Sequence, residues 1–430
     1  MRVAQVSYSN ANGGASRAAY RIHHALRLHG IDSRMHVSSG STDDWTVQKP
    51  EVWAPNTMNS LRYFLGSSST KVLHTENQTL HSTAILPSRW PQWLNQSDAD
   101  VIHLHWVELE MMSIADIGRL REPVVWTLHD MWGFCGAEHF TEEFRWRDGY
   151  TRNNRPAYES GFDLNKWTWR RKQKYWRQPI HIVTPSQWLA NCVRHSSLMQ
   201  DWPVSVVPNA IDTESFQPIE KSLARKLLRI NCEGPLLLFG AVGGARDSRK
   251  GFDLLHSALN HLRGEIEGLE LVVLGELAPK EPVSLGFPVH YAGQLQDDIS
   301  LCLFYSAADA VVVPSRQETF SLVSAEAHAC GTPVVAFDAT ALPGIVEHKK
   351  TGYLVRPFDT EELARGIRWV LDGRERRALL STQSRQAAVA RFSYPVVAEQ
   401  YLQVYNKVLG KEERVSQIDA KPPIECCNVV

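Results

Sequence analysis

Residues 310–333 read AVVVPSRQETFSLVSAEAHACGTP, and the fold class of the chain follows from this segment. The apolar run 310–313 is typical of a buried strand, and 321–330 has the composition of a short helix that Gly331 ends. Glu318 lies in the loop between them. The order strand, loop, helix is typical of βαβ units, so the segment predicts a parallel sheet covered by helices.

Short β-branched runs recur on both sides of this segment, with helix-length stretches between them. At 430 residues the chain is too long for one ordinary hydrophobic core. The runs therefore predict two α/β domains, each with its own parallel sheet. The predicted strands of the first domain are 2–8, 33–39, 100–106, 124–130, 181–186 and 204–208, and those of the second are 235–242, 269–275, 288–293, 310–314 and 333–337.

The join between the two domains is expected near residues 207–210, where an apolar strand stops at a proline and a polar connector begins. Apolar residues recur at helical spacing in 361–371 and again in 394–409, so the ordered chain is expected to end on helices. The segment after residue 410 is polar and is expected to be a flexible tail.

Composition excludes several classes of protein. Lys and Arg number 46 against 47 Asp and Glu, which leaves no overall field to attract nucleic acid. The sequence contains neither a signal-peptide pattern nor an apolar run long enough to span a bilayer. Its seven cysteines show no zinc spacing and no C-x-x-C pair, which fits a reducing cytoplasm.

Two glutamates flank the start of the predicted helix in 310–333. The N-terminus of such a helix presents unpaired N–H groups and a positive dipole end, which suit a diphosphate. Glu318 precedes the helix and can face a sugar, whereas Glu326 lies inside it and can accept hydrogen bonds from ribose hydroxyls. An E-x7-E spacing is common by chance, so the alternative is a pair of surface carboxylates.

A glycine-rich basic loop, FGAVGGARDSRKG at 239–251, follows a predicted strand and precedes an amphipathic helix. Lys250, together with Arg246 or Arg249, can neutralise the charge that builds on a departing diphosphate. The alternative is a solvated basic loop. The pattern matches neither a P-loop nor G-x-G-x-x-G, so it does not favour an ATP or dinucleotide site.

The first domain contributes a second set of candidates. Gly14 follows the first strand and can bring backbone N–H groups to the same phosphates, which places a diphosphate between the domains. His129 and Asp130 end the strand predicted at 124–130, where His129 can contact an acceptor or the transferred sugar. His105 lies on the neighbouring strand, where a structural role is the more common outcome.

The segment 167–177 interleaves tryptophan and tyrosine with lysine and arginine and predicts a basic, aromatic helix. Such a helix can rest on anionic lipid headgroups or simply pack its aromatic side chains and solvate its charges. The acidic pairs 43–44 and 297–298 do not supply a clustered ligand set, so no metal is expected.

Taken together and in order along residues 1–409, these segments resemble glycosyltransferase family 4. The segments that carry the resemblance are 13–15, 127–130, 207–212, 250–252, 318–326 and 331–335. The resemblance implies the α/β fold called GT-B, in which two Rossmann-like doubly wound parallel-sheet domains face each other across a cleft. It implies an acceptor-side domain at 1–207, a nucleotide-sugar domain at 208–390, and a helix at 391–409 that crosses back to the first domain, with the tail at 410–430.

The resemblance also implies roles for individual residues. The catalytic set is His129, Lys250 and Glu318, and the acceptor-side residues are His105 and Asp130. The implied donor-binding residues are Gly13, Gly14, Arg246, Arg249, Lys250, Glu318, Thr319, Phe320, Ser321, Leu322 and Glu326. The chain departs from the family at Ser321, where members usually carry glycine, and in the place of the diphosphate-binding arginine.

The implied activity is metal-independent, retaining transfer of a hexose from a nucleotide-diphosphate sugar, such as a UDP- or GDP-hexose, with no cofactor. Residues 131–136 resemble the branch that acts in bacterial exopolysaccharide and O-antigen assembly, which implies a saccharide or lipid-linked saccharide acceptor and work in lipopolysaccharide or other polysaccharide synthesis at the inner face of the membrane. Two alternatives remain open: a nucleotide-sugar epimerase on the same scaffold, and a non-catalytic protein that binds a sugar nucleotide.

Overall fold

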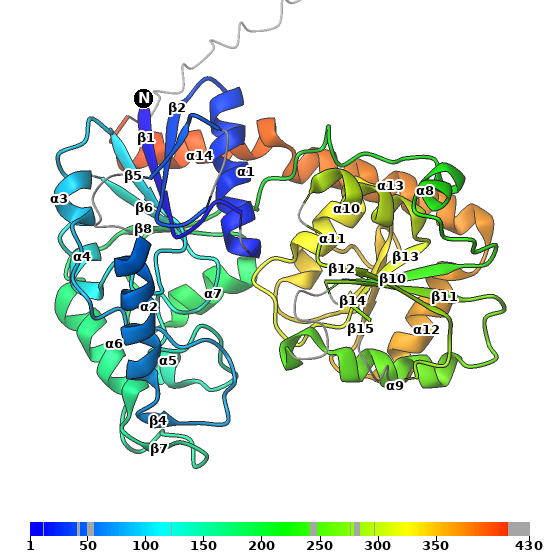
Figure 1. Cartoon of the computed structure of the whole chain (residues 1–430), viewed down its shortest axis with the longest axis horizontal. Coiled ribbons are helices and arrows are strands. Elements are labelled where there is room, and N and C mark those ends of the chain that lie inside the picture. The colour runs from blue at the N-terminus through cyan, green and yellow to red at the C-terminus, as the bar shows by residue number, and fades with distance from the viewer. Residues whose placement is uncertain are drawn as a thin grey trace, which may run out of the picture.

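The structure of the chain is a computed structural model, and it describes residues 1–11, 13–40, 44–49, 56–121, 123–240, 247–275, 277–278, 284–295 and 297–411. In Figure 1 these residues form two lobes that lie side by side. Each lobe is a parallel β-sheet with helices on its faces. The predicted fold class, two doubly wound α/β domains of the GT-B type, is therefore confirmed.

The first sheet has the strand order β3-β2-β1-β5-β6-β8-β9, and all of its neighbouring pairs are parallel. Its strands are rich in β-branched and other apolar residues because both faces of the sheet are covered. The bounds are β1 (Arg2–Ser7), β2 (Asp32–Val37), β3 (Val47–Gln48), β5 (Val101–Leu104), β6 (Val124–Thr127), β8 (His181–Thr184) and β9 (Val204–Val206).

The helices of the first domain are α1 (Gly14–Leu28), α2 (Asn56–Thr70), α3 (Trp90–Leu94), α4 (Ile114–Ile117), α5 (Arg145–Asp148), α6 (Leu164–Tyr175) and α7 (Gln187–His195). A small antiparallel pair, β4 (Leu73–His74) with β7 (Ser160–Gly161), lies outside the main sheet. The sequence did not predict β3, β4 or β7, because two-residue strands are too short to show a period.

The second sheet has the order β12-β11-β10-β13-β14-β15 and is parallel throughout. Its strands are β10 (Leu236–Gly240), β11 (Glu270–Leu274), β12 (Val289–Gly293), β13 (Ala310–Val313), β14 (Val334–Phe337) and β15 (Gly352–Val355). Its helices are α8 (Lys221–Leu227), α9 (Phe252–Leu262), α10 (Asp298–Ala307), α11 (Leu322–Ala329), α12 (Thr360–Leu371) and α13 (Arg374–Phe392). Two buried apolar clusters cover its two faces.

The last helix, α14 (Tyr394–Val408), returns to the first domain, and Figure 1 shows α13 and α14 in orange along the top of both lobes. Its buried Val397, Tyr401 and Tyr405 join the apolar cluster that covers one face of the first sheet. The Tyr401 hydroxyl lies 3.0 Å from Thr127 Oγ1 on β6. The C-terminal helix thus becomes part of the first domain's core.

Several predicted strands run too far toward their carboxyl ends. The strand predicted at 124–130 ends at Thr127, which leaves His129 and Asp130 in the loop that follows β6. The same shortening leaves Trp106 beyond β5 and Pro314 beyond β13. In parallel sheets these loops gather at one edge, and here that edge of each sheet faces the other domain.

Candidate active site

A cavity of about 540 Å³ lies between the two domains, at the carboxyl edges of both sheets. Its walls bring together all of the predicted site residues that the structure describes, except His105. The predicted residues that line it are Gly13, Gly14, His129, Asp130, Arg249, Lys250, Glu318, Thr319, Phe320, Ser321, Leu322 and Glu326. Arg246 falls outside the described residues.

The N-terminus of α11 opens into this cavity. Ser321 caps the helix and accepts a hydrogen bond from the Ser324 N–H at 3.3 Å. Its φ is +96°, in the left-handed region that glycine adopts without strain. This conformation explains why the resemblance predicts glycine at this position. Serine adopts it at a conformational cost, which the hydrogen bond of its side chain to the helix N-terminus partly offsets.

Lys250 and Glu318 form an ion pair in the wall of the cavity, with Lys250 Nζ 2.6 Å from Glu318 Oε1. Ser315 Oγ donates to the same carboxylate oxygen at 2.9 Å. Gly251 fixes this arrangement: its φ is +67°, and a Cβ there would lie 1.9 Å from the Pro314 carbonyl oxygen. Without a ligand the two charges neutralise each other, so a diphosphate entering the cavity would compete with Glu318 for Lys250.

Arg249 is the second cation in the wall. Its Nη2 lies 2.7 Å from Asp247 Oδ2, and its guanidinium carbon lies 4.0 Å from the centroid of the Phe140 ring. Phe140 belongs to the first domain, so this cation–π contact crosses the cleft. Arg249 is therefore held at the cavity by groups from both domains.

His129 reaches the cavity from the first domain. Its Nε2 lies 3.1 Å from His105 Nδ1, and His105 Nε2 is bonded in turn to Gln5 Oε1. Burial lowers the pKa of His129 to about 4, so its imidazole is neutral at pH 7. The structure does not bring His105 to the cavity. His105 is buried behind His129 and fixes its position.

Asp130 lines the cavity, but its oxygens already have partners. Oδ2 accepts hydrogen bonds from His139 Nδ1 at 2.6 Å and Trp106 Nε1 at 2.9 Å, and Oδ1 accepts one from the Trp132 N–H at 2.9 Å. Burial by itself would raise the pKa of this carboxyl. The charge of His139 and these hydrogen bonds have the larger effect, so the pKa lies below its ordinary value. Asp130 therefore orders the loop that carries His139.

Glu326 also lines the cavity and contacts the first domain. Its Oε1 accepts from Arg21 Nη1 of α1 at 2.7 Å, and its Oε2 accepts from the Tyr305 hydroxyl at 2.9 Å. Arg21 Nη2 also donates to Asp298 Oδ1 at 3.1 Å, and Arg17 pairs with the same carboxylate. The group predicted to receive ribose thus takes part in an ion-pair network that joins the domains.

The loop after β13 supplies further contacts across the cleft. The Thr319 hydroxyl donates to the His129 carbonyl at 2.8 Å, and Gln317 Nε2 donates to the Thr141 carbonyl at 3.2 Å. These bonds join the two domains directly beside the cavity.

Several residues that were not predicted from the sequence also lie at the cavity or join the two domains beside it. The sequence does contain a pattern that points to Arg17 and Arg21, because these arginines are four residues apart on one face of α1, directly after Gly13 and Gly14. No sequence pattern points to Phe140, His139 or Tyr305, because only the tertiary fold brings them to the cleft.

In the described part of the chain, no group of three or more His, Cys, Asp or Glu side chains is arranged to hold a metal ion. The same residues include no helix that combines the length and apolar character needed to cross a bilayer.

Comparison with known families gives two matches that together span most of the chain. The family described as Glycosyltransferase Family 4 matches residues 12–215, and the family described as Glycosyl transferases group 1 matches residues 237–373. The first match ends before the second sheet begins, and the second starts one residue into β10 and extends beyond β15.

Curated relatives match over part of their length. The MMP alpha-(1->4)-mannosyltransferase of Mycolicibacterium hassiacum is 32% identical over 229 residues, which are 50% of this chain and 52% of the relative. A D-inositol 3-phosphate glycosyltransferase of Xylanimonas cellulosilytica is 35% identical over 219 residues, 47% of this chain and 51% of the relative. The chain thus spans about half the length of the curated relatives it matches.

Solved structures share the fold over nearly the whole chain. Sucrose-phosphate synthase from Thermosynechococcus elongatus has a TM-score of 0.65 at 18% identity and covers 95% of this chain and 99% of its own. Anabaena HepE in complex with UDP and glucose has a TM-score of 0.61 at 15% identity and covers 94% and 99%. At such identities the likeness concerns the fold alone.

Proposed function

Because this chain belongs to glycosyltransferase family 4, we propose that it is a retaining, metal-independent hexosyltransferase that uses a nucleotide-diphosphate sugar. The acceptor is a saccharide or lipid-linked saccharide of a cell-surface polysaccharide. One observation carries the proposal: Lys250, Glu318 and the N-terminus of α11 meet Gly14 and His129 of the other domain around a single cavity. The HepE complex with UDP and glucose supports a UDP-hexose as the first donor to test.

The diphosphate would take the place of Glu318 as the partner of Lys250. It would also receive the N–H groups at the start of α11 and the charge of Arg249. These donors oppose the negative charge that builds on the leaving oxygen as the glycosidic bond breaks, which is the main electrostatic task of the reaction. Glu318, released from Lys250, would accept hydroxyls of the sugar.

The acceptor attacks on the same face that the diphosphate leaves, and the leaving oxygen takes the acceptor proton. This front-face course needs no enzymic carboxylate as base. It agrees with the state of the cavity's acids, because the carboxylates of Glu318, Glu326 and Asp130 each accept hydrogen bonds from a basic side chain. The neutral imidazole of His129 can donate to or accept from a sugar hydroxyl without carrying charge.

The ribose would contact Glu326, whose carboxylate retains lone pairs beyond the bonds to Arg21 and Tyr305. The base of the nucleotide would lie beside Gln294 and Leu295, which line the same cavity beyond β12. We place the reaction in the cytoplasm, where such sugars are made and where the buried, unpaired cysteines of the described chain would stay reduced.

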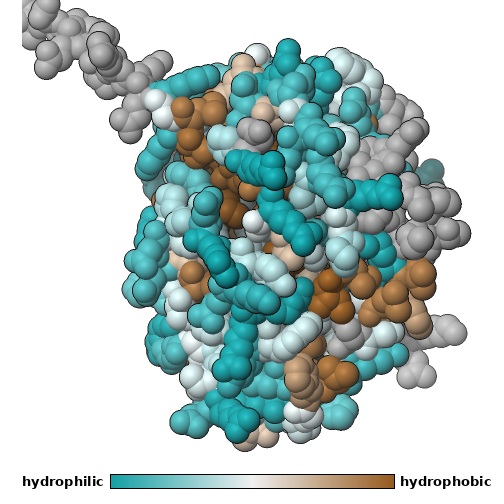
Figure 2. All heavy atoms as spheres, turned by 90° about the vertical axis from the view of Figure 1, so that its left-hand side faces the viewer, coloured by the Kyte–Doolittle hydropathy of each residue, from teal (hydrophilic) through white to brown (hydrophobic). Residues whose placement is uncertain are grey.

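Contact with the inner face of the membrane is a further part of the proposal. The helix α6 supports membrane contact only in part, because Trp169 and Lys172 are buried while Trp167 and Tyr175 are each 38% exposed. The helix α2 exposes Phe64 and two leucines as well. Figure 2 shows the outer face of the first domain as mostly hydrophilic with separate apolar patches, which suits reversible rather than permanent attachment.

A panel of UDP-, GDP-, ADP- and dTDP-hexoses tests the function. The protein should be stabilised against heat by one nucleotide class, because a ligand bound only by the folded state raises the melting temperature. That donor should then release nucleoside diphosphate when a saccharide acceptor is added. Donor consumption with a new free sugar nucleotide and no acceptor would favour the epimerase, and binding without any turnover would favour the non-catalytic alternative.

A further inference from the structure

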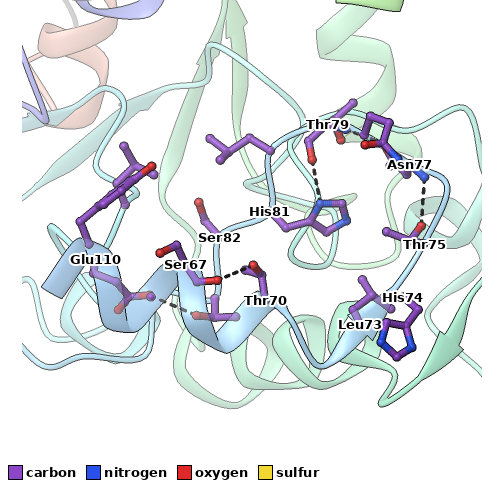
Figure 3. A pocket seen from close by; sticks show the side chains of 16 residues that line it. Ser67, Thr70, Leu73, His74, Thr75, Asn77, Thr79, His81, Ser82 and Glu110 are labelled. Atoms are coloured by element: carbon purple, nitrogen blue, oxygen red, sulfur yellow. Dashed lines mark hydrogen bonds between the residues drawn. The ribbon is translucent and has the colours of Figure 1, made fainter. Parts of the chain in front are cut away.

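A second cavity, of about 610 Å³, lies wholly within the first domain. It is bounded on one side by α2 and on the other by the segment that runs from β4 to Thr83. Figure 3 shows Ser67 and Thr70 of α2 on one side of it and Thr75 and Thr79 on the other. Its volume falls within the range of about 300–1,000 Å³ that is usual for ligand sites.

The second cavity adjoins the cavity between the domains. Thr79 and Leu80 line both of them. A chain of hydrogen bonds also links their walls: Ser82 Oγ of the second cavity lies 2.8 Å from His139 Nε2, and His139 Nδ1 lies 2.6 Å from Asp130 Oδ2 of the first. The two cavities are therefore neighbours that share Thr79 and Leu80 in their walls.

The lining of the second cavity is polar and nearly uncharged. Hydroxyl, amide and imidazole groups predominate among its described side chains, and none of these is lysine or arginine. The carboxylate of Glu110 is engaged by the wall itself: it accepts from the Ile85 N–H at 2.9 Å, the Leu86 N–H at 2.7 Å and Thr83 Oγ1 at 3.1 Å. Phosphate recognition relies on cations and N–H donors, so this lining does not suit a phosphorylated group.

The remaining features of the lining suit a sugar chain. Burial lowers the pKa of His81, so its ring is neutral, and its Nδ1 donates to the Thr79 carbonyl at 2.8 Å. Tyr63 is 49% exposed and Leu80 is 44% exposed at the cavity, and such apolar surfaces pack against the C–H faces of sugar rings. Neutral hydroxyl partners beside apolar faces match the chemistry of an uncharged oligosaccharide.

We infer that the second cavity binds a neutral saccharide portion of the acceptor, behind the sugar that reacts. The inference rests on the proposed function, since it assumes that the cavity between the domains holds the donor. The reacting end of the acceptor passes Thr79 and Leu80 to reach the sugar near His129. Binding of the remote portion holds the reacting hydroxyl in place, a use of binding energy that accelerates the chemical step.

Filling the cavity tests the inference. Ser67 is exposed on α2 and lines the cavity, whereas Leu65, 45% exposed on the same helix, does not line it. Ser67→Trp should therefore block the cavity, and Leu65→Trp is the matched control. The probes are an array of neutral oligosaccharides and a second array of anionic ones, applied with saturating nucleoside diphosphate, whose own affinity is measured separately by calorimetry.

The wild-type protein and Leu65→Trp should bind at least one neutral oligosaccharide, and Ser67→Trp should bind it at least tenfold more weakly with nucleotide affinity unchanged. Equal oligosaccharide binding by the two variants, selective binding of anionic glycans, or no glycan binding by a protein that still binds nucleotide would each overturn the inference. Failure of the wild-type protein to bind any nucleoside diphosphate would instead count against the proposed function.

Discussion

Replacing Arg21 by methionine tests how the ion-pair network between the domains works. The Arg21 side chain is 4% exposed and that of its partner Glu326 is 5% exposed, so the pair is fully desolvated. Burial disfavours the Arg21 charge, but Glu326 and Asp298 outweigh it and raise the Arg21 pKa above its ordinary value. Methionine retains the apolar stem while it removes the guanidinium donors that Arg21 directs at Glu326 and Asp298.

The loss in stability follows from what the substitution leaves behind. Glu326 keeps only the neutral Tyr305 hydroxyl as a donor, at 2.9 Å. Removing one partner of a buried pair costs about 3–5 kcal/mol when the other charge stays buried. The protein can limit this cost by opening the cleft and hydrating Glu326, so Arg21→Met should lower the free energy of unfolding by up to that amount and shift the domains toward an open arrangement.

The assays are urea unfolding and small-angle X-ray scattering of the ligand-free protein. Arg17→Met is the control on the same helix, because Arg17 is 22% exposed and its partner Asp298 is 34% exposed. A pair of that exposure contributes about 1 kcal/mol or less. A double-mutant cycle with Glu326→Gln should give a coupling of about 1–3 kcal/mol. Equal losses for Arg17→Met and Arg21→Met, or strictly additive losses in the cycle, would refute the reasoning.

Three further substitutions test local features. Ser321→Gly should raise the free energy of unfolding by about 1 kcal/mol, because φ at this position is +96° and glycine adopts it without strain. A lower free energy of unfolding in urea would contradict the presence of strain at Ser321. Gly251→Ala should cost about 2–4 kcal/mol through the clash with the Pro314 carbonyl and should slow turnover, whereas the control Gly264→Ala, at φ +76° in open space, should cost only about 1 kcal/mol. Burial lowers the Lys172 pKa from 10.5 to about 7, so between these pH values the unfolded chain binds more protons than the folded one and stability rises with pH. The free energy of unfolding of the wild type minus that of Lys172→Met, measured in urea, should therefore increase by about 1.4 kcal/mol per pH unit above pH 7. A difference that does not change with pH would falsify this.

Most of the fold follows from sequence because the strands of both sheets are short apolar runs between helix-length segments. The helix α13 escaped prediction, since over its 19 residues it buries only Leu380, Ser384, Ala388 and Phe392. Two of those four are small or polar, so the buried stripe does not read as an apolar period. The strand β15 begins at a glycine and is four residues long, which is too short for a pattern.

In the candidate site, too, some residues could be predicted from the sequence and others could not. Lys250, Glu318 and Ser321 could be placed at the cleft from sequence, because each follows a predicted strand on the carboxyl side. The partners of Glu326 could not, because Arg21 lies 305 residues away in the chain and only domain closure brings it there.

Lys172 is a residue whose environment the sequence pattern predicted wrongly. It reads as part of a solvated basic face, yet it is fully buried and donates to the carbonyls of Trp132, Cys135 and Gly136. Charge patterning alone cannot distinguish a lysine in water from one that closes a loop of backbone acceptors.

The rate of nucleoside diphosphate release by Lys250→Ala tests the central claim most directly. The measurement uses the donor that the nucleotide-sugar panel selects, with Arg316→Ala as control, because Arg316 pairs with Asp253 and does not line the cavity. If Lys250 stabilises the departing diphosphate, kcat should fall by about 10²–10³-fold while the control stays near the wild-type rate. A near-normal kcat for Lys250→Ala would contradict the proposed mechanism.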